Sequence, residues 1–243
     1  MTQGLRYARQ VALSDLGENG QAKLAAAHVL IIGLGGLGTP AAAYLAAAGI
    51  GQLSLNDFDS VDATNLARQF LYRESDQGQS KAEVLAERLN LQNPACISRA
   101  ITNRLSAVQL NEAVANCDLV LDCSDNFQTR QLINKACIQN SRLLISGAAI
   151  RLTGQLFEAG PDFRQAPCYE CVYPAGEEGF DDCQGNGILG PVTGTIGSMM
   201  ATRALLRLTG NVPVGGLLLY DASQSEWQQL KIRKNPDCVA CSG

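Results

Sequence analysis

The stretch of sequence that decides the fold is Val29-Leu-Ile-Ile-Gly-Leu-Gly-Gly-Leu-Gly38, which continues as Thr39-Pro-Ala-Ala-Ala-Tyr-Leu-Ala-Ala-Ala48. The four aliphatic residues predict a buried strand, the glycines a tight turn, and the alanine-rich segment a helix with Pro40 near its start and Gly49 closing it. Glycines let the backbone approach a phosphate closely, and a helix N-terminus offers it oriented N–H groups. The stretch therefore predicts a phosphate-binding turn of the Rossmann type.

A second strand and an acidic residue complete this unit. Residues 52–56 alternate as a strand and lead into Asp57-Phe-Asp59, and Asp57 follows the glycines by about 20 residues, the distance at which a carboxylate can bond to ribose hydroxyls. The pattern leaves NAD, FAD and ATP open as the nucleotide. A glycine turn without any ligand is the structural alternative.

A polar loop follows where a dehydrogenase domain usually enters its next strand–helix unit. The loop contains Asn65 and Arg68, and Lys81 then opens a helix whose start is marked by a Ser80–Glu83 capping box. Two cations and an amide suit a triphosphate undergoing reaction, because negative charge develops on the leaving pyrophosphate. Alternatively, Arg68 and Lys81 are solvated cations on the surface.

The chain then continues with regular strands and helices. Strands are predicted at residues 96–101, 119–123 and 143–149, and helices at 106–115 and 127–140. Asp125 follows one of these strands, at the carboxyl edge of the predicted sheet, where ligands bind in open α/β sheets. A carboxylate there is a natural Mg²⁺ ligand. The alternative is that Asp125 is the N-cap of the helix that follows it.

After residue 151 the pattern changes. Segments 154–158, 217–221 and 227–232 look like antiparallel strands added to the parallel sheet, a Gly- and acid-rich loop runs from 168 to 187, and an apolar helix ends near Gly210. We predict one domain over residues 1–243 of the α/β class. It is a Rossmann-like, mostly parallel sheet with helices on both faces and antiparallel C-terminal strands. Residues 28–150 form the nucleotide-binding core, and 151–243 hold the antiparallel strands, a crossover loop and two cysteine pairs.

The two cysteine pairs are matched in spacing: Cys168-Tyr-Glu-Cys171 and Cys238-Val-Ala-Cys241. Two C-x-x-C knuckles can present four thiolates to one zinc ion, at about 2.3 Å each. Four thiolates leave no open position on the metal, so we interpret the site as structural. Two redox dithiols or disulfides are the alternative. Four further cysteines lie in apolar stretches and are interpreted as small buried side chains, namely Cys96, Cys117, Cys123 and Cys137.

Composition narrows the class of protein. Of 243 residues, 46% are hydrophobic and 17% charged, the net charge is −4, and no Lys/Arg cluster stands out, which argues against a nucleic-acid partner. No basic region with an apolar core opens the chain, so we expect no secretion signal, and zinc knuckles with free thiols fit the cytoplasm. Residues 29–56 carry no charge, but glycines and Pro40 interrupt them, so we expect buried structure and no membrane span.

Together these motifs resemble the ThiF/MoeB/HesA family, bacterial relatives of the ubiquitin-activating enzymes. The resemblance covers essentially the whole chain, and the combination is more specific than any one motif. It rests on Arg6-Tyr-x-Arg-Gln10, the glycine run 33–38, Asp57-x-Asp59, Asn65-Leu-x-Arg-Gln69, Lys81, Asp122-x-x-Asp-Asn126 and the two cysteine pairs.

The resemblance implies an activity and a set of site residues. Such enzymes bind Mg-ATP and transfer AMP to the C-terminal Gly-Gly carboxylate of a small ubiquitin-fold sulfur-carrier protein, releasing pyrophosphate. It implies that Asp125 holds Mg²⁺ and that Arg9 reaches the active site of the partner subunit in a homodimer. Asn65, Arg68 and Lys81 would bind the triphosphate and act in catalysis. The implied nucleotide-binding set is Gly33, Gly35, Gly36, Gly38, Asp57, Asp59, Thr64, Asn65, Arg68, Gln69, Lys81, Asp125 and Asn126.

The adenylated carrier is then used for sulfur chemistry in such enzymes. Cys183 falls where the ThiF-like branch places a cysteine that can form an acyl-persulfide link to the carrier, whereas MoeB-like relatives often have a cysteine nearby without needing it. Gly190-Pro-Val-x-Gly194 looks more like ThiF, which favours the thiamine-pathway carrier over the molybdopterin-pathway or a natural-product carrier. The chain stops after the second knuckle, so we expect a separate sulfur donor such as a cysteine desulfurase.

Two other classes of function remain as alternatives. An NAD-dependent dehydrogenase is supported by the glycine run with Asp57. Against it stand the cations of the loop 65–81 and the only histidine, His28, which lies at the start of the first strand and away from the predicted site. A non-catalytic nucleotide sensor or zinc scaffold would bind ATP without releasing pyrophosphate.

Overall fold

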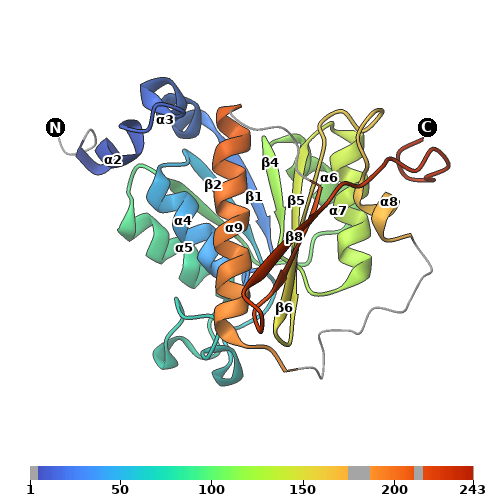
Figure 1. Cartoon of the computed structure of the whole chain (residues 1–243). Coiled ribbons are helices and arrows are strands. Elements are labelled where there is room, and N and C mark those ends of the chain that lie inside the picture. Colours follow the sequence, from blue (N-terminus) through green and yellow to red (C-terminus); the bar gives the residue numbers. More distant parts are fainter. Residues whose placement is uncertain (1–4, 175–186, 211–215, 243) are drawn as a thin grey trace.

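The computed structural model describes residues 5–174, 187–210 and 216–242 (Figure 1). Within these ranges an eight-stranded sheet has the order β3-β2-β1-β4-β5-β6-β7-β8. Its strands are β1 (His28–Ile32), β2 (Gln52–Asn56), β3 (Ile97–Ile101), β4 (Leu119–Asp122), β5 (Leu143–Ile150), β6 (Thr153–Ala159), β7 (Leu217–Asp221) and β8 (Glu226–Leu230). Every predicted strand is confirmed, with ends that shift by at most two residues.

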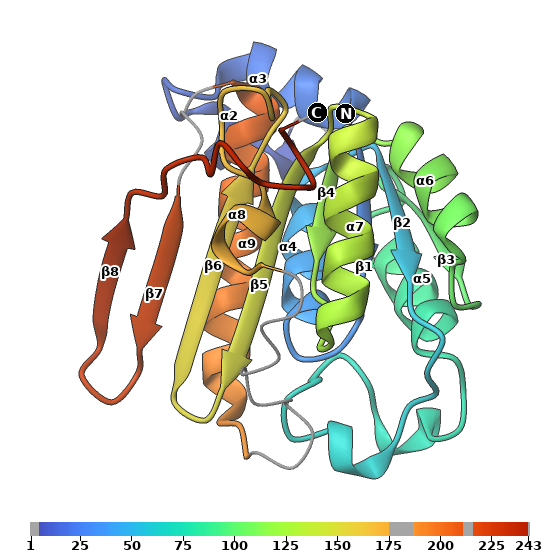
Figure 2. The same ribbon diagram turned by 90° about the vertical axis from the view of Figure 1, so that its right-hand side faces the viewer.

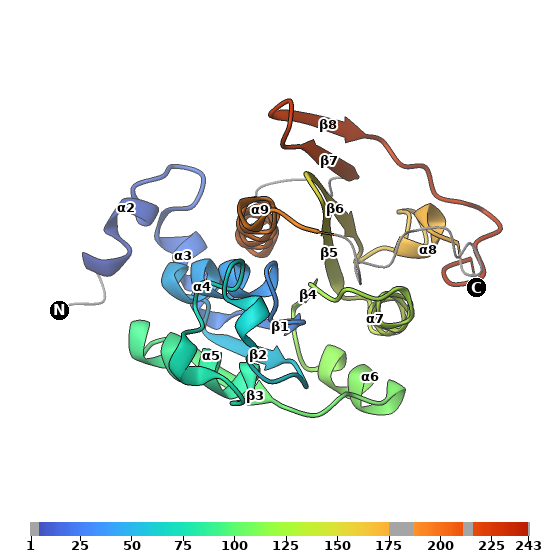
Figure 3. The ribbon, with the colours of Figure 1, turned by 90° about the horizontal axis from the view of Figure 1, so that it is seen from below.

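Helices cover both faces of the sheet, as the sequence predicted. Figure 3 shows α3, α4, α5 and α9 on one side and α6, α7 and α8 on the other. The helices and 3-10 turns are α2 (Ala8–Val11), α3 (Gly17–Ala26), α4 (Gly38–Ala48), η1 (Ala63–Asn65), η2 (Glu74–Asp76), α5 (Lys81–Gln92), α6 (Ala107–Ala115), α7 (Phe127–Gln139), α8 (Tyr169–Val172) and α9 (Gly190–Thr209).

The strand order places a functional edge between β1 and β4. Strands β1 to β5 are parallel, and the chain moves from β1 outward to β2 and β3 before it returns to β4 on the other side of β1. In such sheets ligands bind outside the carboxyl ends of the strands where the order reverses. Strands β6, β7 and β8 are antiparallel and extend the sheet beyond β5, as Figure 2 shows.

The core has two clusters, one between the sheet and α4, α5 and α9, and one between the opposite face and α6, α7 and α8. Strands β1 and β4 are buried almost throughout, and α4 buries eight of its eleven residues, because small alanine side chains let its neighbours approach on several sides. Gly49 ends α4 in the left-handed conformation at φ 89°, as predicted. Residues 29–56 thus form β1, α4 and β2, and no helix in the described ranges is both long enough and apolar enough to cross a bilayer.

Local helix signals in the sequence also hold. Ser106 and Gln109 form both bonds of a capping box at the start of α6. Of the capping box predicted at the start of α5, one bond is seen, in which the Ser80 side chain accepts the N–H of Glu83. These bonds satisfy N–H groups that the first turn of a helix leaves without partners.

Candidate functional site

A cavity of about 960 Å³ opens at the carboxyl ends of β1, β2 and β4, and we call it the glycine-loop cavity. The glycine turn between β1 and α4, the polar loop after β2 and the start of α7 all contribute to its lining. The structure places all of the predicted nucleotide-binding residues except Gly38 in that lining: Gly33, Gly35, Gly36, Asp57, Asp59, Thr64, Asn65, Arg68, Gln69, Lys81, Asp125 and Asn126.

The glycine turn is packed so closely that three of its glycines have no room for a side chain. A Cβ on Gly33 would lie 2.6 Å from the carbonyl oxygen of Cys123. A Cβ on Gly38 would lie 1.9 Å from the carbonyl oxygen of Gly33, and a Cβ on Gly36 would lie 2.7 Å from Oγ1 of Thr193. Gly38 therefore packs against the backbone of Gly33 and stabilises the turn without lining the cavity. Gly36 lines the cavity and packs against Thr193 of α9. This close approach is what a phosphate-binding turn requires.

Asp57 holds the glycine turn to the end of β2. Its Oδ2 accepts the N–H of Leu34 at 2.7 Å and its Oδ1 accepts the N–H of Asp59 at 2.8 Å. Burial raises the pKa of Asp57, although the two backbone hydrogen bonds act in the opposite direction. Asp57 therefore both supports the turn and presents a carboxylate at the cavity wall.

The cations of the site are held in different ways. The Lys81 side chain is 7% exposed and its Nζ lies 3.2 Å from Oδ2 of Asp59, so the interpretation of Lys81 as a solvated surface cation is wrong. Arg68 is half-buried and donates from Nη1 to the carbonyl oxygen of Thr64 at 2.9 Å. Gln69 is 2% exposed, and its Oε1 has no hydrogen-bond partner within the described ranges, so a bound ligand can supply one.

Asp125 and Asn126 divide two tasks at the start of α7. Asn126 is the N-cap, because its Oδ1 accepts the N–H of Thr129 at 2.9 Å. The alternative that Asp125 is the cap is therefore wrong. Asp125 is exposed and lines the cavity, which leaves its carboxylate accessible to a ligand or a hydrated cation.

Several residues that line the glycine-loop cavity were not among the predicted site residues. Arg130 is 7% exposed and donates to Ser146 Oγ at 3.1 Å and to the carbonyl oxygen of Ser124. A signal was available, since Arg130 and Asn134 are spaced i, i+4 on the face of α7 that also carries buried apolar residues. The ring of Phe58 lies 4.2 Å below the guanidinium of Arg104, and both line the cavity. No local sequence signal pointed to that pair.

A second cavity of about 930 Å³ lies over β5 to β8, and we call it the sheet-face cavity. Its walls are mostly aromatic and aliphatic, and they include Tyr220 and Trp227, whose rings stack at 4.5 Å. Asp221 and Glu226 line it as well. The two cavities share Asp125, Arg130, Ala149 and Ile150, so they adjoin at the start of α7 and the end of β5.

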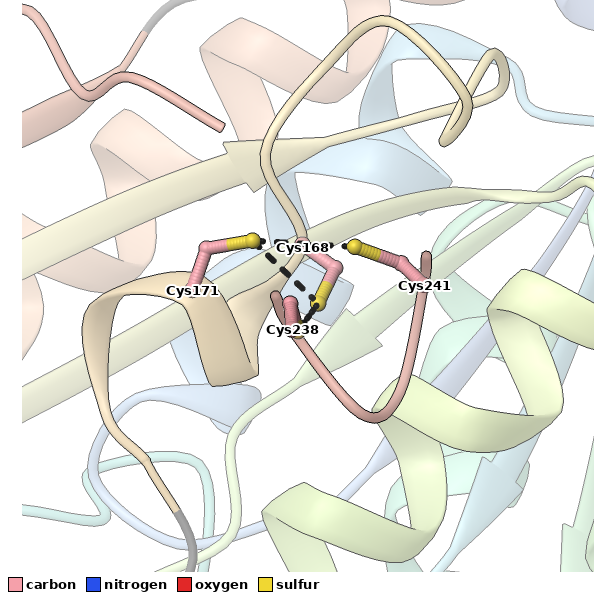
Figure 4. A group of neighbouring side chains, drawn as sticks. All are labelled: Cys168, Cys171, Cys238 and Cys241. Atoms are coloured by element: carbon pink, nitrogen blue, oxygen red, sulfur yellow. Dashed lines mark hydrogen bonds between the residues drawn. The ribbon is translucent and has the colours of Figure 1, made fainter. Parts of the chain in front are cut away.

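The four predicted zinc ligands come together (Figure 4), and none of them lines either cavity. Their sulfur atoms all lie within 4.8 Å of one another, with Cys168–Cys238 and Cys171–Cys241 at 3.6 Å and Cys168–Cys171 at 3.9 Å. A tetrahedron of sulfurs at the zinc–thiolate bond length has edges of about 3.8 Å. The residues therefore fit zinc, and the separations are far longer than a disulfide bond.

The surroundings of the four thiols are unequal. Burial raises the pKa of Cys168 and Cys171. Burial acts in the same direction on Cys241, but the hydrogen bond from Lys234 and those from the neighbouring thiols outweigh it and lower the pKa of Cys241. Ligation needs thiolates, so a bound metal would compete with protons at this cluster.

The sequence model of the ThiF family matches residues 7–240. The chain belongs to the ThiF family. It is 43% identical over 240 residues to the sulfur carrier protein ThiS adenylyltransferase of Escherichia coli K12, covering 98% of this chain and 95% of that protein. It is also 43% identical over 242 residues to the adenylyltransferase and sulfurtransferase MOCS3 of Drosophila yakuba, but spans only 53% of that protein.

Solved structures agree with this ThiF-family assignment at the level of the fold. The crystal structure of E. coli MccB with ATP has a TM-score of 0.80 at 23% identity, covering 92% of this chain and 68% of that one. The structure of MccB with AMPCPP and MccA has a TM-score of 0.83 at 23% identity, covering 97% and 74%. At these identities the likeness shows the fold alone.

One described residue implied by the family resemblance, Arg9, does not line either cavity. Arg9 is exposed on α2, and its neighbour Gln10 donates to the carbonyl oxygen of Ala48 at the last residue of α4. An eleven-residue helix is about 16 Å long, so α2 packs at the end of α4 far from the glycine turn. Cys183 lies within 175–186, outside the described residues. Of the cysteines interpreted as small buried side chains, Cys96, Cys117, Cys123 and Cys137 are all buried.

Proposed function

We propose that this chain adenylates the C-terminal carboxylate of a small ubiquitin-fold sulfur-carrier protein, using ATP and Mg²⁺ and releasing pyrophosphate. The proposal rests on the observation that the two cavities adjoin. A phosphate-type glycine turn, Lys81 and Arg68 face one of them, and at Asp125 that space adjoins a second, largely apolar cavity. One space is suited to a nucleotide and the other to an approaching polypeptide tail.

The reaction follows from this placement. An oxygen of the tail carboxylate attacks the α-phosphorus of ATP, the bond from that phosphorus to the pyrophosphate oxygen breaks, and pyrophosphate leaves with the electron pair. The carboxylate is already ionised at neutral pH, so the site needs positioning and charge stabilisation more than a general base. Lys81 and Arg68 stabilise charge on the phosphates, and Gln69 offers its buried Oε1 to a donor on the nucleotide.

Metal binding fits the charges of the glycine-loop cavity. Its lining carries four cationic and four acidic side chains: Arg68, Lys81, Arg104, Arg130, Asp57, Asp59, Asp62 and Asp125. Carboxylates and a triphosphate repel one another in the same site unless a cation lies between them. Mg²⁺, held by Asp125 and phosphate oxygens, would neutralise the charge that develops on the pyrophosphate. Zinc at the four cysteines is structural in this proposal.

The carrier would dock over the sheet-face cavity. An extended Gly-Gly tail has no side chains to obstruct the passage between the two cavities, and the apolar walls around Tyr220 and Trp227 suit a globular partner with an apolar patch. Asp221 and Glu226 add negative charge, which favours a basic rim on that partner.

The thiamine-pathway carrier is the substrate we favour. Its support is the 43% identity to the E. coli ThiS adenylyltransferase over 95% of that protein's length. The molybdopterin-pathway carrier is the alternative, supported by the similar identity to MOCS3. A separate donor such as a cysteine desulfurase would supply the sulfur.

Carrier-dependent exchange of labelled pyrophosphate into ATP tests the proposal. We expect exchange with the intact carrier and none with a carrier that lacks its last glycine. Asp125→Asn should reduce the exchange rate at least tenfold, whereas Glu87→Gln, an exposed acid on α5, should leave it unchanged. Exchange that depends only on the molybdopterin-pathway carrier would assign the chain to that pathway. Nucleotide binding without any exchange would instead support a non-catalytic nucleotide sensor.

Sulfur transfer after adenylation is tested separately at Cys183. No thiol takes part in the adenylation step, so Cys183→Ser should leave pyrophosphate exchange intact. Formation of the carrier thiocarboxylate, followed by mass spectrometry with sulfur donor present, then assigns the residue. Its loss in the variant indicates a covalent relay, and normal formation indicates that Cys183 is a bystander.

We further propose that the chain acts as a homodimer in which Arg9 reaches the active site of the partner subunit. The reason is that Arg9 lies at the end of α4 that is far from the glycine turn of its own chain. Arg9→Ala and Lys81→Met should each abolish exchange. Mixed and allowed to reassort, the two variants should recover about a quarter of wild-type activity, since half of the dimers then carry one complete site of two. No recovery from well-folded variants that form mixed dimers would exclude a role of Arg9 in the partner's site.

A further inference from the structure

Lys234 lies directly beside the four-cysteine cluster, on the segment between β8 and the second knuckle. Its ammonium has three N–H groups, and the structure gives it three acceptors. These are the carbonyl oxygen of Phe163 at 2.7 Å, the carbonyl oxygen of Cys241 at 2.9 Å and the Sγ of Cys241 at 2.9 Å. One of the four sulfurs therefore receives a short, charged hydrogen bond.

The other knuckle is held by a neutral side chain. Asn134 of α7 donates from Nδ2 to the Sγ of Cys168 at 3.6 Å and accepts the N–H of Tyr169 at 3.0 Å. Both contacts tie the first knuckle to the domain, but an amide brings no net charge. The cluster is thus supported by a fully buried amide on one side and by a cation on the other.

The difference in charge between Lys234 and Asn134 matters because the zinc centre itself is charged. Four thiolates around Zn²⁺ carry a net charge of −2, and the excess charge keeps the sulfurs nucleophilic, so they react with electrophiles or protons and release the metal. We propose that Lys234 is the outer-sphere counter-ion of the zinc centre, which neutralises one of the two excess charges, makes Cys241 a poorer nucleophile and slows the loss of zinc. The inference rests on zinc at the four cysteines and is independent of the adenylation reaction.

A purely mechanical role has to be separated from this one. The two carbonyl contacts of Lys234 also tie the second knuckle to Phe163, and losing that tie alone would loosen Cys238 and Cys241 together. Loss of the charge acts through the Cys241 sulfur. It should therefore change the electronic spectrum of the metal centre and make Cys241 the first cysteine to be alkylated.

The experiment uses the purified, metal-loaded protein with Lys234→Met, Lys234→Gln and Lys234→Arg, and the exposed Lys231→Met as the matched control. We expect the two neutral variants to release zinc to a chromogenic chelator about 10- to 100-fold faster than wild type, the range typical of lost outer-sphere partners. In the cobalt(II)-substituted protein, the sulfur-to-cobalt charge-transfer band should move to longer wavelength in both. Lys234→Arg should restore both properties in large part.

Iodoacetamide labelling with mass spectrometry completes the test. Cys241 should react first in the neutral variants, and all four cysteines should be protected in wild type and in Lys231→Met. The proposal is overturned if the neutral variants match Lys231→Met in release rate and spectrum. It is also overturned if Cys238 and Cys241 become reactive together while the cobalt band stays in place, or if the wild-type protein takes up neither zinc nor cobalt.

Discussion

Different neighbours limit the space for a side chain at each glycine of the glycine turn. A Cβ on Gly36 would meet three side-chain atoms of Thr193, at 2.7, 3.0 and 3.1 Å. Gly36→Ala should therefore destabilise the protein by about 1–3 kcal/mol, as overpacking does. Adding Thr193→Ala removes two of the three atoms and should recover most of that loss. Urea unfolding of the two variants measures both effects.

The matched comparison for this prediction is Gly38→Ala, whose new Cβ would lie 1.9 Å from a backbone oxygen. Thr193→Ala cannot relieve that contact, so the same second substitution should give no recovery there. Thr193→Ala alone sets the baseline. If the Gly36→Ala, Thr193→Ala double variant is no more stable than Gly36→Ala, the clash with Thr193 is not what limits this position.

At the scale of elements, α9 is joined to β6 by a buried ion pair. Arg203 donates from Nε to Oε1 of Glu158 and from Nη2 to Oε2 at 3.1 Å, and the Glu158 side chain is 4% exposed. Removing Glu158 takes its carboxylate away from the Arg203 guanidinium, whose side chain is 21% exposed. Glu158→Ala should therefore lower the free energy of unfolding by about 3 kcal/mol, the low end for a broken buried pair. The exposed Glu87→Ala on α5 should change it little, and urea titration checks both.

A double variant tests whether the loss in the free energy of unfolding comes from the charge that Glu158→Ala leaves behind. Glu158→Leu with Arg203→Met replaces both charges by apolar groups, and such replacements are often neutral. We expect the double variant to be more stable than Glu158→Ala. If it is less stable, α9 depends on the packing of these side chains and not on their charges.

At the scale of the whole molecule, the four-cysteine cluster joins parts of the chain that are 70 residues apart in sequence. Removing zinc with a chelator should lower the melting temperature and release the segment after β8. Trypsin should then cut at Lys231 and Arg233, while residues 5–174 stay protected. Restored zinc should reverse both effects. A chelated protein with unchanged melting and proteolysis would contradict a structural role of the metal.

Much of this molecule could be predicted from local patterns in the sequence. The β1–glycine–α4 unit, the capping of α6 and the left-handed Gly49 at the end of α4 follow from residues close together in the chain. Hydrophobic runs and turn residues act over a few positions, so their signals survive without tertiary context. The paired spacing of the four cysteines is similarly decisive, because few arrangements other than a metal site need it.

Tertiary structure alone decided how the site is completed. It buries Lys81 against Asp59, assigns the cap of α7 to Asn126 so that Asp125 stays accessible, and brings Arg130 to the junction of the two cavities. It also sets Lys234 on the sulfur of Cys241. The sequence by itself determined the elements and the residue types of both sites, since these depend on local periodicity and spacing. Burial, charge pairing and the joining of cavities depend on segments distant in the chain, and only their packing decides them.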